Sequence, residues 1–150
     1  VKTYMGGDNT PYFAAREDST QDISNNTETQ ISLDTEIHDS DSAFASNTFT
    51  CPVGSAGYYF VAGQIDFYDS NSDMSTVIIT IKQNSTIVSK LYADTDEVNS
   101  HMSLSVSAIV NLSEGDTLKL YGHAVTDDAG TWAAYGGEFG AMMHGFKLIT

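Results

Sequence analysis

Residues 102–110 read MSLSVSAIV, and this stretch indicates the fold class most clearly. Apolar side chains occupy positions 102, 104, 106 and 108, with serines between them. Successive side chains of an extended strand point to opposite faces, so this period of two predicts a strand with one buried face. The segments LKLY at 118–121 and ITIK at 79–82 alternate in the same way.

Outward from this stretch, clusters of Asp, Asn, Ser and Gly interrupt the chain at short intervals, as turns do. No window shows the helical period that a crossover between parallel strands would need, so the strands must pair antiparallel. The sequence therefore predicts an all-β sandwich or barrel. Strands are expected at 11–16, 29–37, 47–52, 57–68, 75–83, 86–93, 102–111, 117–126 and 138–149.

The length and charge of the chain limit its partners. Its 150 residues suit a single domain spanning 1–150, and because it begins with Val1 we expect it to be the C-terminal part of a longer chain. Asp and Glu number 20 against 6 Lys and Arg, a formal charge of -14. Such a chain repels phosphate backbones and anionic lipid, so we expect no nucleic-acid partner. No apolar run is long enough to span a bilayer, so no membrane insertion is expected.

Five segments, taken in order, resemble the motifs of C1q/TNF-like globular domains. They are TPYFAAR at 10–16, FTC and GYYF within 49–60, ITIKQN at 79–84, LSEGDTL at 112–118 and MHGFKL at 143–148. This resemblance implies a jelly roll of two antiparallel sheets and a homotrimer. The Ser-, Thr- and Asp-rich composition and the segment LDTEI at 33–37 are more similar to the C1q-like domains of phage and bacterial fibre or surface proteins.

Aromatic residues on one strand give a physical reason for trimerisation. In 57–68, aromatics fall on both parities: Tyr58, Tyr59, Phe60, Phe67 and Tyr68. One parity faces the core, so the other is exposed or covered by a neighbouring copy. A threefold axis would cover it, whereas a monomer would leave tyrosines in water.

Catalytic motifs are missing from the sequence. The single cysteine, Cys51, lies in a strand-like run and is expected to be a buried small side chain. No His-x-His pair, nucleophile elbow or phosphate loop occurs, and we expect no enzyme activity. A carboxylate pair acting on a polysaccharide stays open as an alternative, because twenty acids form many pairs.

Asp69, Asn71 and Asp73 begin a D-x-N-x-D pattern, the start of a calcium loop. Oxygen ligands at alternate positions suit a hard cation, so these residues are candidate Ca²⁺ ligands. No Glu closes the loop at the usual distance, which favours a solvated Asx-rich turn instead. No other cofactor is expected.

The segment 127–137 holds the candidate ligand-binding residues Trp132 and Tyr135 among small residues. An exposed Trp flanked by glycines can stack on a sugar or anchor a partner. The alternative is that Trp132 packs into the core or against a neighbouring subunit.

The leading hypothesis is a trimeric binding knob of a phage fibre or similar external appendage. It would lie outside the cell or on the virion surface and recognise a cell-surface glycan or protein. The alternative is a non-binding trimerisation, capping or capsid-decoration domain, and the second alternative is a polysaccharide-acting enzyme.

Overall fold

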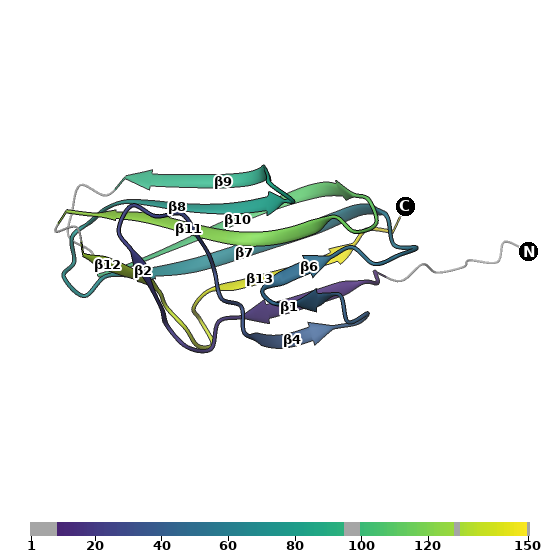
Figure 1. The fold of residues 1–150 in the computed structure, drawn as a ribbon, viewed down its shortest axis with the longest axis horizontal. Coiled ribbons are helices and arrows are strands. Elements are labelled where there is room, and N and C mark those ends of the chain that lie inside the picture. Colours follow the sequence, from purple (N-terminus) through teal and green to yellow (C-terminus); the bar gives the residue numbers. More distant parts are fainter. Residues whose placement is uncertain (1–8, 95–99, 128–129, 150) are drawn as a thin grey trace, which may run out of the picture.

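Two antiparallel β-sheets packed face to face make up this computed structural model, which describes residues 9–94, 100–127 and 130–149 (Figure 1). Within the described residues, sheet I contains seven strands: β1 (Tyr12–Arg16), β2 (Gln21–Ser24), β4 (Thr35–Asp39), β7 (Gly57–Tyr68), β10 (His101–Leu112), β12 (Thr131–Ala134) and β13 (Met142–Lys147). Sheet II contains six: β3 (Thr29–Gln30), β5 (Phe44–Ala45), β6 (Thr48–Thr50), β8 (Met74–Gln83), β9 (Thr86–Asp94) and β11 (Thr117–Thr126). The predicted all-β sandwich of antiparallel sheets is confirmed.

The longest ladder joins β7 to β10, from the pair Gly57 and Leu112 to the pair Tyr68 and His101. On its other side, β7 pairs with β13 over one half of its length and with β12 near its end. β1 and β4 continue the sheet beyond β13. β7 therefore organises sheet I, and its alternation decides which residues face the core.

Odd-numbered residues of β7 point into the sandwich, where Tyr59, Val61, Ile65 and Phe67 are fully buried. Even-numbered residues point away from sheet II, onto what we call the outer face of sheet I. Buried leucines and isoleucines of β8 and β11 pack opposite the odd set. Each large side chain buried in this way contributes about 1.5–3 kcal/mol, which makes the register strongly specified.

The expected strand at 29–37 is wrong as one element. β3 pairs with β11 in sheet II, whereas β4 pairs with β1 in sheet I, and residues 31–34 cross between the layers. Ile31 and Leu33 of this crossing segment are buried, so its side chains still alternate between the core and the surface although the segment is not part of a strand. The backbone N–H of Ile31 donates to the Leu120 carbonyl at 3.0 Å, and that of Ser32 to Oε1 of Gln21 at 2.9 Å.

Three strands were not predicted: β2, β5 and β12. Each has four residues or fewer, too short to show an alternation. The expected strand at 138–149 is shorter in the structure, where β13 covers Met142–Lys147. These differences matter for function because β12 carries Trp132.

Candidate functional site

Trp132 is a core residue, which confirms the alternative left open by the sequence analysis, and its interpretation as an exposed platform is wrong. Its side chain is 1% exposed and its ring lies against Phe67, with 5.1 Å between the centroids. A Cβ on Gly122 would come within 2.8 Å of the Trp132 ring, so that glycine makes room for the indole. A side chain enclosed in this way offers no surface for stacking, and Trp132 is not a ligand-binding residue.

Tyr135 remains at the surface, 44% exposed, directly after β12. Its ring meets Tyr68 edge-on at 5.8 Å between centroids and His101 edge-on at 5.3 Å. The rings of Tyr68 and His101 are 4.7 Å apart. Three aromatic side chains from β7, β10 and the segment after β12 thus form one surface group, which we call the aromatic cluster.

Asp66 fixes the polar edge of the aromatic cluster. Its Oδ2 lies 3.0 Å from Nδ1 of His101, and its Oδ1 accepts a hydrogen bond from the Ser103 hydroxyl at 3.1 Å. All of these side chains share the outer face of sheet I, because residues two apart on a strand point the same way. The Ser103 hydroxyl is bound to the carboxylate rather than to the imidazole, so this group lacks the serine–histidine hydrogen bond of a nucleophilic relay.

Close backbone packing holds Tyr135 in place. Its N–H donates to the Asp66 carbonyl at 2.9 Å, and its own carbonyl accepts from the N–H of Ala141 at 3.0 Å. A Cβ on Gly140 would lie 1.9 Å from the Tyr135 carbonyl oxygen, and one on Gly136 would lie 2.6 Å from the carbonyl carbon of Ser19. The glycines therefore permit a tightly folded segment, and they do not flank an exposed platform.

The aromatic cluster can bind a ligand that is apolar on one side and polar on the other. Tyrosine rings provide flat apolar area with a hydroxyl at the tip, and the His101–Asp66 pair offers hydrogen-bond partners beside it. Sequence reasoning found Tyr135 but missed Tyr68, His101, Asp66 and Ser103. The sequence showed that Asp66 and Tyr68, and likewise His101 and Ser103, are two residues apart on one strand. It did not show the register that places these two strands side by side.

The predicted calcium ligands form a turn in the structure. Asp69 is buried, its Oδ1 accepts the Asn71 N–H at 3.1 Å, and its Oδ2 accepts the Asp73 N–H at 2.9 Å. Both oxygens of Asp69 are thus engaged by the backbone, as in an Asx-type turn. No group of three or more His, Cys, Asp or Glu side chains suited to a metal occurs among the residues described. Calcium binding at this segment stays a prediction.

Apolar side chains line the other end of the outer face of sheet I. Tyr12, Phe146, Phe60 and Ile109 are direct cross-strand neighbours on four adjacent strands. The rings of Phe60 and Phe146 are 5.5 Å apart, and Ile109 is 66% exposed. We call this row the apolar row. Phe60 in this row belongs to the set of aromatics in 57–68 that lies outside the core, as the sequence analysis expected of one of the two sets.

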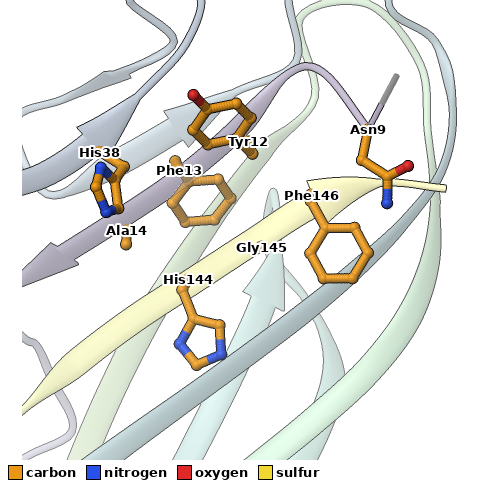
Figure 2. Close-up of a pocket in the computed structure, with 8 residues that line it drawn as sticks. All are labelled: Asn9, Tyr12, Phe13, Ala14, His38, His144, Gly145 and Phe146. Carbon is orange, nitrogen blue, oxygen red and sulfur yellow. The ribbon is translucent and has the colours of Figure 1, made fainter. Parts of the chain in front are cut away.

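A shallow pocket of about 380 Å³ opens beside the apolar row (Figure 2). His38 and His144 come from β4 and β13 and lie on either side of Ala14 of β1 in the register. Nδ1 of His144 is buried and has no hydrogen-bond partner. The lining is mainly aromatic and aliphatic: Asn9, Tyr12, Phe13, Ala14, His38, His144, Gly145 and Phe146.

Cys51 is a structural thiol, as expected. It is buried, and its Sγ lies 3.7 Å from the Tyr59 hydroxyl. Burial is the largest influence on Cys51 and raises the pKa of its thiol, which disfavours the reactive thiolate.

Glu17 is the unusual ionisable group of the core. Its side chain is 0% exposed, and neither carboxylate oxygen has a hydrogen-bond partner. Burial, together with the negative charge of Asp34, raises its pKa to about 8. Glu17 is therefore mainly protonated at neutral pH.

Among the described residues, no helix is long and apolar enough to cross a membrane. Comparison with protein-family models found no match, and comparison with curated proteins found none either. Among solved structures, the globular domain of zebrafish complement 1qA protein is similar, with a TM-score of 0.62 and 17% sequence identity. The match covers 93% of this chain and 98% of that one. The chain therefore has a C1q-like jelly-roll fold, as its motifs predicted.

Proposed function

We propose that this chain is a homotrimeric binding knob of a phage fibre or similar external appendage. It would lie outside the cell or on the virion surface and recognise a cell-surface glycan, with no chemistry of its own. The exposed aromatic cluster with its Asp66–His101 pair carries this proposal, because it joins flat apolar rings to hydrogen-bonding groups on a rigid sheet. Rigid strands keep such a site preorganised, which limits the entropy lost on binding.

The position of the aromatic cluster suits a terminal knob. β7 ends and β10 begins at one end of the sandwich, whereas β1 begins and β13 ends at the other (Figure 1). A shaft joined at the β1 end would present Tyr68, His101 and Tyr135 outward. Three copies would then raise the apparent affinity for a surface that carries many glycans.

The apolar row supports the trimer. It runs from the pocket across the outer face of sheet I to Ile109 of β10, and exposed Leu91 lies on the neighbouring edge strand β9. The Ser89 hydroxyl of β9 donates to the Ser107 carbonyl of β10 at 3.0 Å, which places the two edge strands together. An apolar row on the sheet face and an exposed Leu91 on the edge strand fit a head-to-tail contact, and a threefold rotation between copies closes such contacts into a ring of three. The neighbouring edge would cover the pocket and the apolar row.

Glycan binding by variants tests the proposed role of the aromatic cluster. Tyr135→Ala should weaken binding to glycan arrays at least about tenfold, because truncating a tyrosine anchor commonly removes more than 1 kcal/mol. Phe139→Ala is the matched control, since Phe139 is 87% exposed, lies in the same segment and stacks on no other ring among the residues described. Unchanged binding by Tyr135→Ala would remove the aromatic cluster from the recognition of glycans.

Mass in solution tests the proposed trimer. Analytical ultracentrifugation at micromolar concentration should give three times the protomer mass, and Ile109→Glu should give single protomers. Val53→Glu is the control, because Val53 is also highly exposed but lies in the loop before β7. Single wild-type protomers would refute the trimer. A trimer that binds no glycan would instead favour the capping or decoration domain. In that case the apolar row would account for trimerisation, and no binding site would be needed.

A further inference from the structure

The outer face of sheet II, the face turned away from sheet I, concentrates positive charge in an acidic protein. Lys82, Lys90 and Lys119 project from it, half of the chain's six Lys and Arg residues. β8, β9 and β11 together contain a single acidic residue, Asp94, although the chain has 20 Asp and Glu. We call the three lysines the lysine group.

The register places the lysine group within a small area. Lys82 of β8 lies directly opposite Lys119 of β11. Lys90 of β9 lies opposite Thr80, two residues from Lys82 on the same face. Direct cross-strand neighbours have Cβ atoms about 5 Å apart and diagonal ones about 7–8 Å. Like charges in these positions repel, so the pairing of Lys82 with Lys119 opposes stability.

Of the three ammonium groups in the lysine group, one is paired with an acidic side chain and two are not. Lys82 pairs with Glu28 at 2.6 Å, and its Nζ lies 4.2 Å from the centre of the Tyr121 ring. In the described part of the chain, the side chains of Lys90 and Lys119 form no ion pair and no hydrogen bond. Asp94, the nearest acid along β9, already accepts hydrogen bonds from Thr76 and Tyr92. Two ammonium groups thus stay available for an external anion.

We propose that the lysine group binds the anionic groups of an acidic polysaccharide, either sulfate esters or carboxylates. The group spans three strands, about 10 Å at the usual strand spacing, which fits one or two anionic groups on a short stretch of sugar. The formal charge of -14 opposes the approach of any long polyanion, so only the sugars within reach of the lysine group contribute to binding, and duplex DNA serves as the comparison polymer. This site is separate from the aromatic cluster, because it lies on the opposite face of the sandwich.

Binding of charged and neutral dextrans tests the proposal. The full chain should bind dextran sulfate at low salt and ignore uncharged dextran, and polygalacturonate should show whether carboxylates serve as well as sulfates. Lys119→Gln should weaken dextran sulfate binding about tenfold, since a charge-assisted contact is lost, and should reduce the salt dependence. Lys119→Arg should retain binding.

The control has the same change in net charge. Lys147→Gln removes one positive charge from sheet I and should leave dextran sulfate binding almost unchanged. Tyr135→Ala should also leave it unchanged, which separates this site from the glycan site proposed above. Equal losses in Lys147→Gln and Lys119→Gln, or no binding of either charged polymer, would overturn the proposal. Binding of duplex DNA that depends equally on Lys119 would overturn the assignment to polysaccharides.

Discussion

Replacing Glu17 by glutamine should stabilise this protein at alkaline pH and leave its stability in acid almost unchanged. Glu17 follows β1 with the inward parity of Phe13 and Ala15, so its carboxyl points toward the core. Arg16 and Asp18 flank it in the chain, but they form an ion pair with each other at 3.2 Å. Among the described residues no cation pairs with Glu17, and the charge of Asp34 opposes its ionisation.

The direction of the pH dependence follows from the raised pKa. Below about pH 4.5, Glu17 is protonated in both the folded and the unfolded protein. Above that pH the unfolded chain ionises, whereas the folded protein keeps its proton until about pH 8. Glu17 therefore lowers the free energy of unfolding as the pH rises from about 4.5 to about 8, and its effect is constant above that range. Glutamine carries no titrating proton and removes this contribution.

The magnitude is large for one side chain. The folded-state pKa of about 8 lies about 3.5 pH units above 4.5, and each unit corresponds to 1.36 kcal/mol, so the upper value is about 5 kcal/mol. Relaxation and water entry reduce the penalty of a buried charge, so we expect Glu17→Gln to gain about 2–4 kcal/mol at pH 8.5. Glu36→Gln, at an exposed position of β4, is the control for net charge.

Urea unfolding at pH 5 and pH 8.5, followed by the fluorescence of Trp132, measures this difference. All proteins must be compared at one concentration, because association adds to stability. The wild type and Glu17→Gln should differ little at pH 5 and widely at pH 8.5. Parallel pH profiles for the two proteins would refute the reasoning, since they would show that Glu17 is ionised in the folded state or is not buried.

Three further substitutions test the packing described above. Gly122→Ala should lower the free energy of unfolding by about 1–3 kcal/mol, because the added Cβ would lie 2.8 Å from Trp132. The double variant Gly122→Ala with Trp132→Phe should lose less free energy of unfolding than the sum of the two single changes. Asp69→Ala should lower the free energy of unfolding by about 1–3 kcal/mol with or without Ca²⁺, as measured by thermal unfolding, since two backbone N–H groups lose their acceptor. A large loss of stability seen only in the presence of Ca²⁺ would instead support the calcium loop. Cys51 should resist labelling by a thiol reagent at neutral pH until urea unfolds the protein, and rapid labelling of the folded protein would contradict its burial.

The sequence by itself determined the fold class, the long strands and, where apolar and polar residues alternate, the inward face of a strand. In β10, and in the segments 118–121 of β11 and 79–82 of β8, apolar and polar residues alternate, and a strand backbone turns that period into one buried face. In β7 aromatic residues occupy both parities, so the sequence indicated that one set lies outside the core and the structure decided that it is the set of Tyr58 and Phe60. Local pattern was sufficient here because strand geometry converts spacing directly into direction.

The tertiary structure alone decided where the short strands lie and which distant residues meet. Trp132 lies among glycines and small residues that look like a surface loop, but β12 pairs with β2 and β7 and turns the indole into the core. Tyr68, His101 and Tyr135 become neighbours only through the registers of three strands far apart in the chain. Register depends on contacts summed over whole sheets, and no local stretch of sequence contains that sum.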